Sequence, residues 1–275
     1  MLGIGGIAGL GVATAVVVLL NALFTAEQIA AWAWRLPFLL AIVLAGLSLY
    51  IRLALEDSPV FEDLKARDLT ARSPVRTVLT TQIGTVGKIV GVAAVQTIGG
   101  YLTTVFAITY LSVHLGYGAA YAASLSTIAL VVGVFVAPLA GAISDRTGRK
   151  PLIAGAHVSY LVLTLPLLLV LQHVKDSFGL ALLAVIVMTL PSYVLSGGGL
   201  DLLRRDLPAA TRYSGMSLGF NIAVMLGGVS PFVAALLIRL TGSPLAPAYI
   251  VIVIGVIGLL TLRTLHETGR AGLRA

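Results

Sequence analysis

The sequence contains no cysteine, which excludes a disulfide framework, a thiolate metal site and a cysteine nucleophile. Charged residues are also scarce, at 11% of the 275 residues, whereas 58% are hydrophobic. Soluble domains are usually about half apolar and about a quarter charged, so this chain has more apolar surface than a water-facing fold can bury. These proportions exclude an ordinary soluble protein.

Catalytic signatures are missing as well. The chain has no phosphate-binding loop and no His-Glu-x-x-His zinc motif. Its glycine-rich segments lie in apolar spans with no strand before them, so they do not form a serine nucleophile elbow. No carboxylate lies deep in an apolar run, and only four histidines are left to serve as a base or a metal ligand. We therefore expect no enzyme, no cofactor and no metal site.

Long apolar runs dominate what is present. A helix needs about 20 apolar residues to cross a hydrocarbon core of about 30 Å. Because unpaired backbone amides are costly in lipid, helices fit such runs better than the short alternating strands of a barrel. The runs cover residues 2–24, 36–55, 83–113, 119–143, 152–171, 178–200, 217–240 and 246–265. The predicted fold class is an all-α integral membrane protein with about eight transmembrane helices.

The net charge of +7 comes from short basic clusters between these runs, not from one polar domain that could bind nucleic acid. Fourteen of the 18 lysines and arginines fall on one side of the predicted membrane, three on the other, and Lys88 lies within a span. Cytoplasmic loops are enriched in Lys and Arg. We therefore expect a multi-pass protein of the cell membrane, inner or plasma, with a cytoplasmic C-terminus and a lipid environment.

A polar stretch at residues 56–76 separates two early spans from six later ones and predicts a cytoplasmic linker. The predicted organisation is residues 1–55, a linker at 56–76, and a six-helix part at 77–275. Met1 opens directly into an apolar run without the positive flank that normally orients a first helix. We therefore expect the chain to be the later part of a longer protein.

The segment between the fourth and fifth spans reads Asp-Arg-Thr-Gly-Arg-Lys-Pro from Asp145 to Pro151. Gly148 can supply a positive φ, Pro151 can start the next helix, and the cations can anchor the turn among headgroups. Taken alone, the segment is explained equally well as a basic turn that obeys the positive-inside rule. The candidate gating residues in it are Asp145, Arg146, Gly148, Arg149 and Lys150.

The same segment resembles the loop signature of the major facilitator superfamily, which recurs between helices 2 and 3 and between helices 8 and 9. Two further stretches, residues 34–61 and 212–221, resemble the metabolite:proton symporter family within it, and the likeness continues through residues 227–228, 231–232 and 241–244. The resemblance assigns the eight spans to helices 5 to 12 of a twelve-helix transporter. Residues 1–55 would then be the last two helices of the N-terminal half, and residues 77–275 the complete C-terminal half.

The resemblance implies alternating access, in which two halves rock about a midplane site. It also implies proton-coupled symport of a small organic acid or related polar metabolite, with the loop signature biasing the rocking and the proton-carrying carboxylate in the missing N-terminal half. The expected partners are the substrate, protons and either that missing half or a second copy. The alternative is a truncated membrane protein, or a helical scaffold, that transports nothing.

Polar residues recur along the third span at spacings of three and four, which places them on one face of a regular helix. That row is Thr85, Lys88, Val92, Gln96, Gly99, Thr103, Phe106 and Tyr110. Lys88 costs about 2.5 to 3.5 kcal/mol at mid-bilayer, so it either snorkels to the headgroups or attracts a substrate carboxylate. Gln96 and Thr103 fit interhelical hydrogen bonds as well as ligand contacts.

Two other spans add candidates. Tyr193 lies among Pro191, Ser192 and Ser196, before a run of three glycines that either unwinds a helix beside a cavity or allows close helix packing. Asn221 shares a face with Ser214 and Ser217 and either lines a vestibule or packs. The candidate cavity residues are Lys88, Gln96, Thr103, Tyr110, Tyr193 and Asn221.

Overall fold

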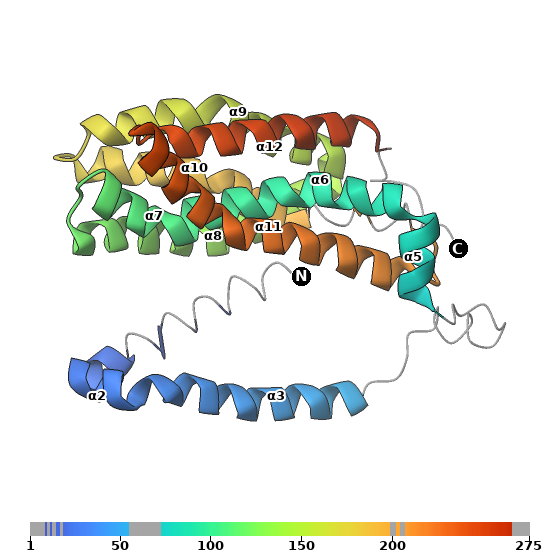
Figure 1. Ribbon diagram of the computed structural model, residues 1–275, viewed down its shortest axis with the longest axis horizontal. Helices are drawn as coiled ribbons and strands as arrows, with labels where there is room; N and C mark the ends of the chain where they lie inside the picture. The colour runs from blue at the N-terminus through green and yellow to red at the C-terminus, as the bar shows by residue number, and fades with distance from the viewer. Residues whose placement is uncertain are drawn as a thin grey trace. The chain divides into compact units, whose positions relative to one another are not determined.

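The computed structural model is built from helices (Figure 1). It describes residues 19–54, 73–198, 202–203 and 207–265, together with positions 9, 12, 15 and 16, and it contains no strand within these ranges. The first helices are α2 (Ala26–Ala31), η1 (Ala33–Arg35), α3 (Leu36–Ala54) and α5 (Pro74–Thr81). They are followed by α6 (Ile83–Gly100), η2 (Tyr101–Val105), α7 (Phe106–Thr109), η3 (Tyr110–His114), α8 (Ala119–Thr147), α9 (Arg149–His173), α10 (Phe178–Gly198), α11 (Arg212–Thr241) and α12 (Ala246–Arg263).

Seven helical segments of the described chain are long and apolar enough to cross a membrane. They correspond to the seven runs predicted from residue 36 onward, which confirms the all-α membrane class. The predicted first span, residues 2–24, falls largely outside the described residues. Several helices extend beyond the apolar runs because charged residues do not end a helix: α8 continues through Asp145 and Arg146, and α9 begins at Arg149.

The chain divides into two compact units, one covering most of residues 4–70 and the other residues 71–275. In the first unit, α2 begins with a capping box: the Thr25 hydroxyl accepts from the Gln28 amide, and the Gln28 side chain accepts from the Thr25 amide. Helix α3 follows and exposes most of its apolar side chains.

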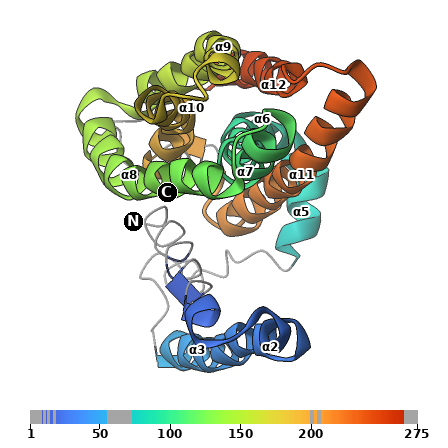
Figure 2. The same cartoon turned by 90° about the vertical axis from the view of Figure 1, so that its left-hand side faces the viewer.

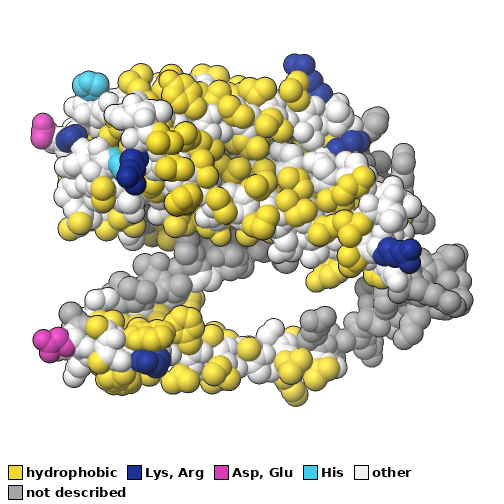
Figure 3. Space-filling model, in the orientation of Figure 1, with side chains coloured by type: hydrophobic (Ala, Val, Ile, Leu, Met, Phe, Trp, Pro, Cys, Tyr) yellow, Lys and Arg dark blue, Asp and Glu magenta, His cyan; other side chains and the backbone are white. Residues whose placement is uncertain are grey.

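In the second unit α6 is the central helix, with α10, α11 and α12 packed against it (Figure 2). Helix α10 also packs against α8 and α9, and α9 packs against α12. Fully buried side chains of several helices, such as Ile89 and Val95 of α6, Leu125 of α8 and Ile153 of α9, belong to one hydrophobic core. On the face seen in Figure 3, hydrophobic side chains cover much of the unit's flank, and most of the charged side chains in view lie toward its two ends, as expected for a protein whose flank faces lipid.

The third predicted span is not a regular α-helix along its whole length. Two π-helical segments, η2 and η3, interrupt it at residues 101–105 and 110–114. A π-turn is wider than an α-turn, so side chains beyond it are rotated relative to those before it. The expected single polar face therefore holds for the regular helix up to Gly100 and not for the part that follows.

Candidate functional site

Gln96 joins α6 to α10 through side-chain hydrogen bonds. Its Nε2 donates to the Ser196 hydroxyl oxygen over 3.1 Å, and that hydroxyl donates to the Ser192 carbonyl over 2.9 Å. Gln96 and Ser196 are half-buried, so the pair lies where the two helices meet, at the edge of the unit's core. The arrangement supports interhelical contact and leaves part of both side chains accessible.

Thr103 lies about two turns further along, and its hydroxyl donates to the Gly99 carbonyl over 2.7 Å. Tyr160 of α9 packs its ring and hydroxyl directly over Gly99, and the Ser192 hydroxyl lies against Gly100. Sequence reasoning did not single out Tyr160 as a site residue. The signal that could have found it is the Gly99–Gly100 pair, since adjacent small residues within a membrane helix allow a neighbouring side chain to approach.

Tyr110 and Tyr193 are the two buried aromatic candidates, 3% and 4% exposed. The Tyr110 hydroxyl donates to the Pro244 carbonyl over 2.8 Å and so ties η3 to the turn between α11 and α12. The Tyr193 ring packs against Gly133 of α8, and its hydroxyl has no hydrogen-bond partner among the described residues. These two side chains therefore lie in different interfaces.

Lys88 and Asn221 are both at least partly accessible. Lys88 is half-buried and forms no hydrogen bond or ion pair with another described residue. Asn221 is exposed, and its Nδ2 donates to the Ser217 carbonyl and hydroxyl over 2.7 and 3.2 Å. Ile89 contacts Gly219, which places Lys88 and Asn221 at a similar level of the α6–α11 pair.

The six cavity candidates thus occupy separate places rather than one cluster. Gln96 and Thr103 lie near the α9–α10 side of α6, and Lys88 and Asn221 lie near the α6–α11 contact. Tyr110 and Tyr193 pack elsewhere. Among the described residues, no group of three or more His, Cys, Asp or Glu could hold a metal ion.

A double-mutant cycle can measure whether the Gln96–Ser196 hydrogen bond is structural. We expect Gln96→Ala and Ser196→Ala to be coupled by about 0.6 kcal/mol in the free energy of unfolding, the average for such bonds between membrane helices. The measurement is detergent unfolding of the purified protein without substrate. Ser124→Ala combined with Gln96→Ala is the control, because the Ser124 hydroxyl donates only to its own helix. Zero coupling would contradict a structural role.

The loop between α8 and α9 turns at Gly148, whose φ of +99° is a conformation that glycine adopts readily. The Gly148 amide donates to the Ser144 carbonyl over 3.0 Å and closes the end of α8. Asp145 and Arg146 are exposed, whereas Arg149 and Lys150 are half-buried.

The Lys150 ammonium donates to the carbonyl of Leu265, just beyond the end of α12. A cation near a helix C-terminus interacts favourably with the unpaired carbonyls there. The contact connects the start of α9 with the end of the last span of the unit, and no pattern in the sequence predicted it.

The sequence profile described as the Major Facilitator Superfamily matches residues 1–200. Curated relatives include the glycine betaine/proline/ectoine/pipecolic acid transporter of Dickeya dadantii, 34% identical over 98% of this chain and 55% of its own length. They also include the proline/betaine transporter of Escherichia coli K12, 28% identical over the same shares, and the ectoine/proline transporter of Corynebacterium glutamicum, 28% identical over 87% of this chain and 49% of its own length. No solved structure matches. The chain spans about half the length of these relatives. The superfamily match and the transporter relatives confirm the expectation that the chain is not an enzyme.

Proposed function

Since the chain belongs to the Major Facilitator Superfamily, we propose that it works in secondary active transport of a small zwitterionic metabolite of the proline or betaine kind, coupled to protons. The observation that carries this proposal is the match to proline/betaine transporters along 98% of the chain. These relatives favour a zwitterion over the simple organic acid that Lys88 alone would suggest. A zwitterion still carries a carboxylate for which Lys88 is a suitable partner.

In this proposal residues 77–275 are the C-terminal half of a twelve-helix transporter, and α3 belongs to the other half. The linker at residues 56–76 joins the halves, and the C-terminus is cytoplasmic. Alternating access exposes a midplane site first to one side of the membrane and then to the other. The described spans hold no carboxylate deep in the membrane, which supports a proton carrier located in the N-terminal half.

The α8–α9 loop would bias this rocking. Lys150 at the start of α9 donates to the Leu265 carbonyl just beyond the end of α12. This contact supports a role in which the loop stabilises one position of these two helix ends relative to each other. Because a contact shifts an equilibrium only if it differs between the two states, the loop must lose contacts when that side opens. Asp145, the acidic residue of the signature segment 145–151, is exposed and can contact a partner in the other half.

The test is uptake of labelled proline and glycine betaine into vesicles with an inward proton gradient. It compares the 275-residue chain alone with the same chain joined to the N-terminal part of the Dickeya dadantii transporter that it does not match. We expect uptake by the joined chain that stops when a protonophore collapses the gradient. Asp145→Asn should reduce the uptake rate while membrane insertion is preserved, because the loop loses its negative charge.

Four results would contradict parts of this proposal. No uptake by the inserted joined chain would favour a non-transporting membrane protein. Uptake that continues at the same rate after the protonophore is added would exclude proton coupling. Uptake by the chain alone would show that the proton carrier need not lie in the other half, and an unchanged rate in Asp145→Asn would exclude the role of the loop.

A further inference from the structure

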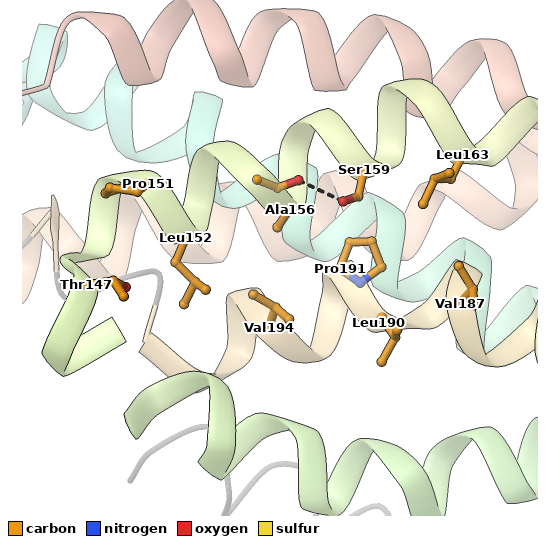
Figure 4. Close-up of a pocket in the computed structure, with 11 residues that line it drawn as sticks. Thr147, Pro151, Leu152, Ala156, Ser159, Leu163, Val187, Leu190, Pro191 and Val194 are labelled. Atoms are coloured by element: carbon orange, nitrogen blue, oxygen red, sulfur yellow. Dashed lines mark hydrogen bonds between the residues drawn. The ribbon is translucent and has the colours of Figure 1, made fainter. Parts of the chain in front are cut away.

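An open groove of about 520 Å³ runs between α9 and α10 (Figure 4). It is lined by Thr147, Pro151, Leu152, Gly155, Ala156, Ser159, Leu163, Val187, Leu190, Pro191 and Val194. The two hydroxyls in this lining are already engaged within their own helices. Ser159 donates to the Gly155 carbonyl over 2.8 Å, and Thr147 donates to the Ile143 carbonyl over 2.9 Å. The groove therefore presents an apolar surface, to which water is poorly suited.

The length of the groove matches one leaflet of a bilayer. From Leu152 to Leu163 the helix rises about 16 Å, at about 1.5 Å per residue. Half of a hydrocarbon core of about 30 Å is about 15 Å. An apolar groove of this length, on a helix pair that crosses the membrane, fits one acyl chain lying parallel to the helices.

Two arginine side chains lie near one end of the groove. Arg149 precedes Leu152, Ala156 and Ser159 at spacings of three, four and three, which puts it on the same face of α9 as the groove lining. Arg146 is exposed next to Thr147, at the same end. Long basic side chains at a helix end keep their charge at the level of the headgroups. The carboxylate of Asp145 is also exposed at this end, and the Lys150 ammonium donates to the Leu265 carbonyl. Arg146 and Arg149 add two positive charges near this end of the groove.

From this apolar groove with cations at one end, we propose that α9 and α10 bind one anionic phospholipid. One acyl chain lies in the groove, and the phosphate is held by Arg146 and Arg149. Anionic headgroups bind basic pockets between membrane helices by this charge complementarity. The site lies beside the loop that joins α8 and α9, so occupancy adds contacts to that loop whether or not the chain transports a solute.

The test measures lipid retained by the purified 275-residue chain with native mass spectrometry. The protein is offered equal amounts of phosphatidylglycerol and phosphatidylcholine with identical acyl chains. We expect one phosphatidylglycerol to be retained in preference, and the double variant Arg146→Gln/Arg149→Gln to reduce that preference about tenfold, since charge-assisted hydrogen bonds are lost. Arg263→Gln removes an exposed cation from α12 and should leave the preference unchanged.

A second variant fills the groove. A side chain at Gly155 meets no atom within 4 Å at its Cβ, so Gly155→Phe can occupy the groove without a backbone clash. We expect it to abolish retention of the phosphatidylglycerol, whereas Gly179→Phe, at an equally open position near the other end of α10, should not. Helical content by circular dichroism confirms folding of each variant.

The proposal is wrong if both phospholipids are retained equally, because the groove is then an ordinary lipid-facing surface. It is also wrong if Gly155→Phe retains phosphatidylglycerol as well as Gly179→Phe does. Dissociation of an oligomer by Gly155→Phe would assign the groove to a second copy of the chain and overturn the lipid site.

Discussion

Replacing Gly197 with alanine is expected to destabilise the folded protein by about 1 to 3 kcal/mol, the usual cost of overpacking a close contact. A Cβ at this position would overlap the carbonyl oxygen of Ala137, and the Gly141 amide nitrogen would lie only 3.0 Å away. Both neighbouring groups belong to the backbone of α8, so rotation of a side chain cannot relieve the overlap. Helices α8 and α10 would have to separate along one of the main contacts of the unit. The measurement is the unfolding midpoint of the purified protein in detergent.

Gly179→Ala is the matched control because it makes the same substitution in the same helix. A Cβ at Gly179 meets nothing within 4 Å, so alanine should be neutral there or stabilise the helix by about 0.5 to 1 kcal/mol. Equal unfolding midpoints for the two variants would show that α8 and α10 do not approach as closely as the structure places them.

Replacing Lys88 with glutamine is expected to raise the KM for proline uptake about tenfold or more and to leave the maximal rate largely intact. A charge-assisted hydrogen bond contributes about 1.5 to 3 kcal/mol, and about 1.4 kcal/mol corresponds to a factor of ten in affinity. Lys88 is half-buried on the central helix and pairs with no described side chain, so its ammonium group can receive a substrate carboxylate. The measurement is uptake as a function of proline concentration by the chain joined to the N-terminal part of its Dickeya dadantii relative.

Lys88→Arg keeps the positive charge and should retain most of the affinity. Arg76→Gln removes an exposed cation of α5 and should leave the KM unchanged. If Lys88→Gln lowers only the amount of inserted protein and not the affinity, then Lys88 snorkels to the headgroups and does not bind substrate.

The predicted membrane spans agree closely with the structure because lipid leaves the backbone little choice. An apolar run that crosses hydrocarbon must satisfy its amides internally, and a helix does so whatever lies beside it. Hydropathy therefore located α3, α6 and α8 through α12. The glycine of the loop signature predicted the turn between α8 and α9 for a similar local reason, since the positive φ of Gly148 is a property of one residue.

The candidate site was predicted less completely, because its residues meet across large distances in the sequence. Gln96 and Ser196 are 100 residues apart in the sequence, and Tyr110 and Pro244 are 134 residues apart. Periodicity showed that Lys88 and Gln96 share a helix face, but it assumed a regular helix and missed the π-helical segments that follow Gly100. It also gave no reason to choose Tyr160, whose position depends on the space that Gly99 leaves open.

The amino-acid sequence is enough to predict that this protein is helical and spans a membrane, because those properties follow from the transfer of side chains and amides between water and lipid. Its motifs also indicated the superfamily. The folded chain was needed to show which helices touch, that Lys150 contacts Leu265, and that α9 and α10 leave a groove between them. Lipid is as apolar as the helices, so hydropathy cannot select a partner helix. That choice is made by the shapes of small residues and by single hydrogen bonds, which exist only once the helices have packed.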